Sequence, residues 1–307
     1  MVALLFPGQG AQYVGMGRDL ADRYPAVRDL WREADEALGV ELSRIAWEGP
    51  EQELTATHNA QPAILVHSIA VFRLVAGAFE DVRFAAGHSL GEFSAYVAAG
   101  SLDFADAVRL VRRRGELMHR SGEERPGTMA AILGLDDEAV ERVCREASAP
   151  GAECVAANYN APGQVVVSGD VAAVERAIAL AREAGARRAL RLNVSGAFHS
   201  PLMATAEAGL AAELESARFA APRFPVVSNV TAEPVTDAAS ARALLLRQLT
   251  APVRWVACMR TILSAGVQDF VELGPGSVLS GLLKRIDAGA RTQTLGTAAE
   301  VERFIDA

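Results

Sequence analysis

One serine of this chain stands in a sequence context that could make it a covalent nucleophile. Ser89 is the centre of GHSLG at 87–91, the single G-x-S-x-G match in the sequence. A run of small and apolar residues precedes the match, and residues 92–99 can form a helix that Gly100 ends. Strand, sharp turn and helix are what a nucleophile elbow requires, and the N–H of Leu90 would then point where an oxyanion forms. An ordinary glycine-rich turn is the alternative interpretation.

A serine hydroxyl needs a base at neutral pH, and the chain offers five histidines. His88 is adjacent to the serine and cannot easily reach back to it. His67 lies in the middle of a helical pattern, where a packed or surface histidine is the more common case. His199 follows the last predicted strand of a small unit and precedes a helix. Spacing alone ranks His199 only modestly above His58 and His119.

An inward-turned arginine is the third chemical feature. Residues 103–118 follow a helical pattern with one apolar face. Arg113 points away from that face, whereas Arg114 lies at its edge. A buried arginine is costly unless it meets a carboxylate. That carboxylate could belong to the chain or to a substrate, which a guanidinium binds in a bidentate manner. The sequence leaves both options open.

The elements that would position these residues alternate between short apolar runs and helical patterns. This alternation is typical of an α/β protein with a mainly parallel sheet. Turn residues follow each predicted strand. The predicted strands are 3–6, 82–86, 226–230 and 269–273, and two of the predicted helices are 61–74 and 254–263.

The stretch 128–194 has a different order of elements. It predicts strands at 128–133, 153–157, 164–168 and 187–194, and helices at 138–146 and 171–184. The order βαββαβ is the split βαβ, or ferredoxin-like, unit. We therefore expect a small ferredoxin-like domain at 127–195, inserted into a large α/β catalytic domain made of 1–126 and 196–307.

Composition and charge limit the classes of function. Half of the 307 residues are hydrophobic, and the net charge is −8 with both signs interspersed, which argues against a nucleic-acid binder. Cys144, Cys154 and Cys258 show no paired spacing, so we expect neither disulfides nor a metal site. The apolar run 2–6 is too short for a signal peptide, and we expect no stretch that reaches the ~18 to 20 apolar residues of a membrane span. A cytoplasmic enzyme without membrane contact is expected.

Several separate motifs give the chain a resemblance to malonyl-CoA:acyl carrier protein transacylases and to the related acyltransferase domains of polyketide synthases. The resemblance runs from Leu5 to about Leu283. Its motifs are FPGQGAQ at 6–12, GHSLGE at 87–92, RG at 114–115, NYNAPGQ at 158–164, GAFHS at 196–200, NVT at 229–231, QLTAPV at 248–253 and ELGPG at 272–276. The fold that the resemblance implies is a hydrolase-like α/β domain with a ferredoxin-like insert.

The resemblance also implies roles for individual residues. Ser89 matches the nucleophile that becomes acylated, and His199 matches its base. The backbone N–H groups of Gln9 and Leu90 match the oxyanion hole. Arg114 matches the arginine that binds the free carboxylate of the malonyl group.

Four more residues match positions around the same pocket. The backbone carbonyl of Gln248 would orient the catalytic imidazole, so the site resembles a dyad more than an acid-completed triad. Gln61 and Asn160 would line the pocket and contact substrate. Phe198 resembles the malonyl-selective pattern, because its ring leaves little room for an α-methyl branch, an exclusion worth ~1 to 3 kcal/mol.

The implied reaction moves a malonyl group from malonyl-CoA, through a malonyl-serine ester, to the phosphopantetheine thiol of an acyl carrier protein. It would serve fatty acid or polyketide synthesis and needs no metal or redox cofactor. The main alternative is a stand-alone polyketide acyltransferase that serves carrier domains in trans. A serine thioesterase or esterase and a non-enzymatic docking module are less favoured. We expect a monomer whose local basic patch, with candidates Arg187, Arg188 and Arg191, docks the acidic carrier protein.

Overall fold

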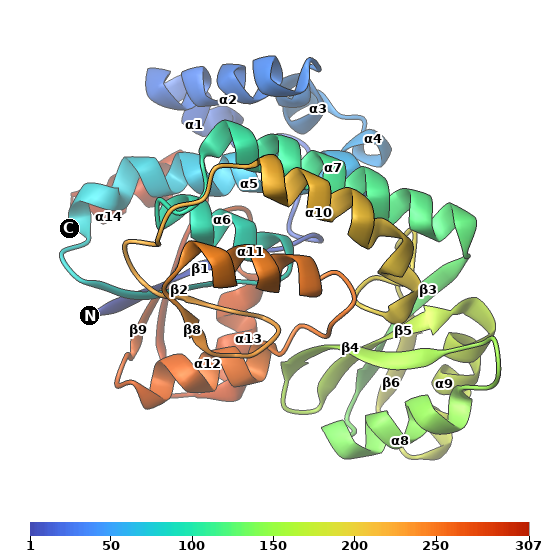
Figure 1. Cartoon of the computed structure of the whole chain (residues 1–307). Helices are drawn as coiled ribbons and strands as arrows, with labels where there is room; N and C mark the ends of the chain where they lie inside the picture. Colours follow the sequence, from blue (N-terminus) through green and yellow to red (C-terminus); the bar gives the residue numbers. More distant parts are fainter. Residues whose placement is uncertain (307) are drawn as a thin grey trace.

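The computed structural model describes residues 1–306 and contains two sheets (Figure 1). The strands are β1 Val2–Phe6, β2 Val82–Gly87, β3 Gly127–Leu133, β4 Cys154–Ala161, β5 Gln164–Asp170, β6 Arg188–Arg191, β7 Val226–Val227, β8 Pro234–Val235, β9 Asp269–Leu273 and β10 Arg291–Leu295. The α-helices are α1 Arg18–Arg23, α2 Pro25–Leu38, α3 Leu42–Glu48, α4 Glu51–Thr55, α5 Thr57–Val75, α6 Leu90–Ala98, α7 Phe104–Glu124, α8 Asp137–Ala147, α9 Val171–Glu183, α10 Glu207–Ser216, α11 Ala238–Arg247, α12 Trp255–Ser264, α13 Val278–Ile286 and α14 Ala298–Ile305. Two 3-10 helices, η1 Ala76–Ala78 and η2 Pro201–Ala206, complete the described elements.

The larger sheet has the strand order β10-β9-β1-β2-β7-β8, and all its pairings are parallel except that of β8 with β7. Side chains of β1 alternate between its two faces. Leu4 and Phe6 join the hydrophobic cluster of α5, α6 and α7, whereas Ala3 and Leu5 join that of α12 and α13. Figure 1 shows these two groups of helices on opposite sides of the sheet. Burial on both faces explains why the central strand β1 of this sheet is an apolar run.

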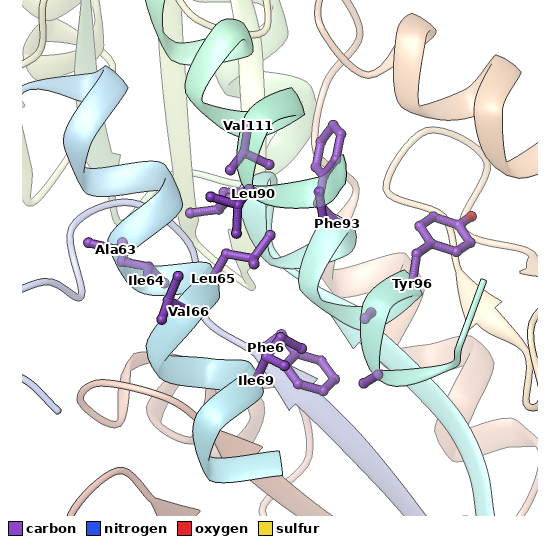
Figure 2. Packing of buried hydrophobic residues seen from close by; sticks show 14 of the residues in the cluster. Phe6, Ala63, Ile64, Leu65, Val66, Ile69, Leu90, Phe93, Tyr96 and Val111 are labelled. Atoms are coloured by element: carbon purple, nitrogen blue, oxygen red, sulfur yellow. The ribbon is translucent and has the colours of Figure 1, made fainter. Parts of the chain in front are cut away.

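Helix α5 lies at the centre of the larger core. Figure 2 shows Leu65 and Ile69 of this helix packed against Phe6 and Leu90. A helix that is apolar on all sides is a buried helix. The segment Thr57–Ala78 is in fact long and apolar enough to cross a membrane, which corrects the expectation that no such stretch exists, but 78% of its most apolar window is buried inside the fold.

The smaller sheet has the antiparallel order β4-β5-β3-β6, with α8 and α9 contributing to its own hydrophobic cluster. This is the strand order of a ferredoxin-like unit, so the predicted fold class is confirmed. Strand β4 also touches the large unit: Tyr159 N–H donates to the carbonyl of Val253, and Val253 N–H donates to that of Ala157. The edge of the small sheet is therefore fixed beside the carboxyl ends of the larger one (Figure 1).

Some elements differ from the sequence-based expectations. Strand β7 has two residues instead of the predicted 226–230, because the chain turns at Ser228, whose carbonyl accepts from Ala232 N–H. Strand β6 is shorter than 187–194. Strands β8 and β10 were not predicted, and the first four residues of β10 alternate between exposed and half-buried, as expected at a sheet edge.

Candidate active site

Ser89 occupies the tight turn between β2 and α6. Its backbone has φ 51° and ψ −106°, in the left-handed half of backbone space that non-glycine residues rarely adopt. The flanking glycines are required: a Cβ on Gly87 would lie 1.8 Å from the carbonyl carbon of Gly91, and one on Gly91 would lie 2.0 Å from the oxygen of Phe6. The strained turn is held by Asn229, whose Oδ1 accepts from Ser89 N–H at 2.8 Å.

The imidazole of His199 contacts the serine hydroxyl. Nε2 lies 2.7 Å from Ser89 Oγ, and Nδ1 lies 2.9 Å from the carbonyl oxygen of Gln248. A carbonyl can only accept, so Nδ1 carries the proton and Nε2 accepts from the serine hydroxyl. Burial, assisted by the nearby charge of Arg114, lowers the pKa of His199 from 6.5 to about 3. The imidazole is thus neutral at physiological pH and free to take a proton.

The predicted inward arginine is buried, with 1% of Arg114 exposed. Its Nη1 donates to Gln61 Oε1 at 2.8 Å, and its Nη2 donates to Gln248 Oε1 at 3.0 Å and to Ser89 Oγ at 3.1 Å. Within residues 1–306, Arg114 forms no hydrogen bond or ion pair with a carboxylate, and its Nε has no hydrogen-bond partner. Burial lowers the pKa of Arg114 to about 10. The internal salt bridge left open by the sequence is therefore absent from the described chain.

A cavity of about 390 Å³ opens above these groups, between the two sheets. Its wall includes Gln9, from the loop after β1, and Leu90, from the first turn of α6. Strands β1 and β2 are parallel neighbours that end together at Phe6 and Gly87, so the two loops meet at one edge. The N–H of Leu90, at the first position of α6, has no partner available inside its own helix.

The remaining predicted pocket residues take different places. Asn160 lines the cavity and accepts at Oδ1 from His88 Nε2 at 2.8 Å, which joins the small sheet to the nucleophile turn. Phe198 lines the cavity next to the imidazole. Gln61 does not line the cavity; it lies buried behind Arg114 and holds the guanidinium.

The other histidines lie elsewhere. His67 is buried on α5 and bonds to the carbonyl of Gly296. His58 and His119 lie beside each other, with ring centroids 6.1 Å apart. Of the five histidines, all within the described residues 1–306, His199 is the one that hydrogen-bonds to the serine.

Sequence reasoning missed a buried network behind the nucleophile. Glu92 Oε2 accepts from Asn229 N–H at 3.1 Å and from Gln248 Nε2 at 2.7 Å. Burial raises the pKa of Glu92 to about 7, although these hydrogen bonds and Arg114 act in the opposite direction. Only the backbone of Gln248 was expected to matter, and its side chain proves to be the centre of the network. The final glutamate of GHSLGE was the available signal.

Comparison with known proteins agrees with this geometry. A family model described as "Acyl transferase domain" matches residues 3–300. The malonyl CoA-acyl carrier protein transacylase of Bacillus subtilis is 45% identical over 304 residues, which cover 99% of this chain and 96% of that protein. The crystal structure of an acyl carrier protein S-malonyltransferase from Vibrio cholerae is similar with a TM-score of 0.94 at 43% identity, over 98% and 99% of the two chains. A malonyl-transacylase in complex with a type II polyketide synthase acyl-carrier protein gives a TM-score of 0.95 at 42% identity, over 99% of both chains.

Proposed function

We infer that this chain, which belongs to the malonyl CoA-acyl carrier protein transacylase family, carries the malonyl group as an ester on Ser89. The enzyme transfers malonyl from malonyl-CoA to an acyl carrier protein, for fatty acid or type II polyketide synthesis. The observation that supports Ser89 and His199 as the reacting pair is the contact of 2.7 Å between the serine oxygen and an imidazole nitrogen that has no proton of its own.

In the first half-reaction, Ser89 Oγ attacks the thioester carbon of malonyl-CoA while His199 Nε2 takes the hydroxyl proton. The former carbonyl oxygen becomes an oxyanion, which we place against the backbone N–H groups of Gln9 and Leu90 at the cavity wall. When the tetrahedral intermediate collapses, the carbon–sulfur bond breaks and the imidazolium returns the proton to the coenzyme A thiolate. A malonyl-serine ester remains.

The second half-reaction runs these steps in reverse with a different thiol. His199 takes the proton of the phosphopantetheine thiol, the sulfur attacks the ester carbon, and Ser89 leaves with the proton. Water must be kept from the ester between the two steps. The position of the ester at the base of a cavity between two sheets supports this requirement.

Arg114 is proposed to hold the free carboxylate of the malonyl group. No carboxylate of the described chain pairs directly with this buried guanidinium, although the charge of Glu92 acts on it, and a substrate carboxylate would supply the direct partner. The unpartnered Nε and the second Nη1 hydrogen leave donors for it. Phe198, beside the imidazole, is proposed to limit space for an α-methyl branch.

We propose that the protein acts as a cytoplasmic monomer with the domain division 127–195 and 1–126 plus 196–307. The strands of the small sheet, which lie between Gly127 and Arg191, support this division.

For docking of the acidic carrier protein, Arg187 and Arg188 remain the better candidates, because Arg191 is paired with Glu175.

The test is intact-mass analysis after the protein is mixed with malonyl-CoA and then with holo acyl carrier protein. A gain of one malonyl group that disappears when the carrier is added is expected. Ser89→Ala should show no gain, whereas Ser264→Ala, at an exposed serine whose hydroxyl bonds only to the carbonyl of Thr261 in the described chain, should behave as wild type. A malonyl group on Ser89→Ala would refute the assignment. Competition between fatty acid and polyketide carriers would then identify the pathway.

A further inference from the structure

Glu92 takes no part in the reaction steps above, but it lies directly behind the nucleophile. It belongs to the first turn of α6, three residues after the nucleophile, and it is fully buried. A carboxyl group at a fully buried position requires an explanation, because an apolar side chain there would avoid the cost of desolvation.

A single carboxylate oxygen joins the two residues that support the nucleophile. Glu92 Oε2 accepts from Asn229 N–H and from Gln248 Nε2. Asn229 in turn accepts from Ser89 N–H, and Gln248 Nε2 also lies 3.1 Å from the carbonyl oxygen of Ser89. The other oxygen, Oε1, has no partner in the described chain.

The amide of Gln248 could in principle be turned in either of two ways. As found, its NH₂ faces oxygen atoms and its Oε1 accepts from Arg114 Nη2. The contact with Glu92, at 2.7 Å, is the shortest, whereas Asn229 Oδ1 is 3.4 Å away and already accepts from Ser89. Without the carboxylate, the NH₂ group would lose its strongest acceptor, and a reversed amide would present hydrogens to the guanidinium.

We propose that Glu92 is a positioning residue for acyl-group selection: its carboxylate turns the amide oxygen of Gln248 toward Arg114 and so holds the guanidinium ready for a substrate with a free carboxylate. This rests on the proposed role of Arg114. Gln61 holds Nη1, so the loss of the Gln248 contact would leave Nη2 held only by the hydroxyl of Ser89, the group that reacts.

The experiment compares two variants at this position. Glu92→Gln keeps an acceptor oxygen that the N–H groups of Asn229 and Gln248 would orient, whereas Glu92→Met removes it. Glu272→Gln is the matched control, because Glu272 is also a buried carboxylate that accepts two backbone N–H groups, those of Leu279 and Ser280. Acylation of Ser89 is measured with malonyl-CoA and with acetyl-CoA, together with Tm.

We expect the malonyl-to-acetyl ratio of kcat/KM to fall about tenfold or more in Glu92→Met, mainly through KM for malonyl-CoA. The ratio should be restored to within about threefold of wild type in Glu92→Gln and should stay unchanged in Glu272→Gln.

Equal losses for both acyl groups in Glu92→Met would overturn the inference, because they would indicate a merely structural role. An unchanged ratio, or a Glu92→Gln variant as impaired as Glu92→Met, would overturn it too. Wild-type protein that forms no malonyl-serine at all would instead refute the proposed function, so the two failures are distinguishable.

Discussion

Replacing Arg114 by Met should impair the selection of malonyl over acetyl while leaving the stability of the fold nearly unchanged. The substitution retains an unbranched side chain of similar length but removes the buried charge. When the guanidinium of such a buried pair is removed, the carboxylate left without a partner loses about 2 to 5 kcal/mol of binding free energy. At about 1.36 kcal/mol per factor of ten, kcat/KM for malonyl-CoA should fall about 30- to 5,000-fold.

Acetyl-CoA has no such carboxylate and should respond differently. It loses only the hydrogen bond from Arg114 Nη2 to Ser89 Oγ, and it no longer has to place a methyl group against a cation. We expect kcat/KM for acetyl-CoA to stay within about tenfold of wild type. The malonyl-to-acetyl ratio should therefore collapse.

The fold should tolerate the same substitution. The pKa of Arg114 falls from 12.5 to about 10 on burial, which corresponds to a cost of roughly 3 kcal/mol that is fully present at neutral pH. Removing the cation relieves this cost, while the amide oxygens of Gln61 and Gln248, each left without its donor, cost about 1 kcal/mol or more apiece. The free energy of unfolding should change by no more than about 1 to 2 kcal/mol.

The assay is stopped-flow acylation with the two thioesters, combined with urea unfolding. Arg113→Met is the matched control, because Arg113 is the adjacent residue of α7 and lies exposed beside Glu116. Equal losses on malonyl and acetyl groups, or a fold destabilised by more than about 4 kcal/mol, would refute the reasoning and make Arg114 a structural residue.

Four further predictions concern the base, the acyl pocket and the turn. Because the pKa of His199 is about 3, the acylation rate should stay level from about pH 8 to pH 5, and an inflection near 6.5 would contradict this. The free energy of unfolding should fall as pH drops from about 6.5 towards 3, since the unfolded chain gains a proton that the folded imidazole does not, and urea unfolding against pH checks this. Phe198→Ser should raise kcat/KM for methylmalonyl-CoA relative to malonyl-CoA by about 10- to 100-fold, and an unchanged ratio would remove the steric argument. Gly91→Ala should cost about 3 kcal/mol or more in stability, because its Cβ would lie 2.0 Å from a backbone oxygen, whereas Gly281→Ala, in a helix with open space around it, should gain about 0.5 to 1 kcal/mol.

Local sequence signals predicted the parts of the site that are built locally. The five residues GHSLG were enough to predict the tight turn around Ser89, whose glycines are required by close backbone contacts. The helical pattern of 103–118 was enough to predict that Arg114 faces inward. The same holds for the fold class, because the order of strands and helices is itself local information. The parallel ladder between β9 and β10 was missed, since a half-exposed edge strand has a weak apolar pattern.

Contacts between distant segments could not be predicted in this way. Spacing ranked His199 only modestly above His58 and His119, because the partner of His199 lies 110 residues away along the chain. The network behind the nucleophile joins Glu92 to Gln248 across 156 residues, and its geometry depends on where α11 ends relative to α6. Only the packing of these helices brings the residues together.

The group behind the catalytic imidazole is the backbone oxygen of Gln248, and a neutral dipole stabilises an imidazolium less than a carboxylate does. The positive ring is then a short-lived species, which favours leaving groups that depart without much help from an acid. A thiolate, with a parent pKa near 8.5, is such a group, and an amine is not. The architecture therefore suits thioester substrates, and we expect it to leave peptide bonds untouched.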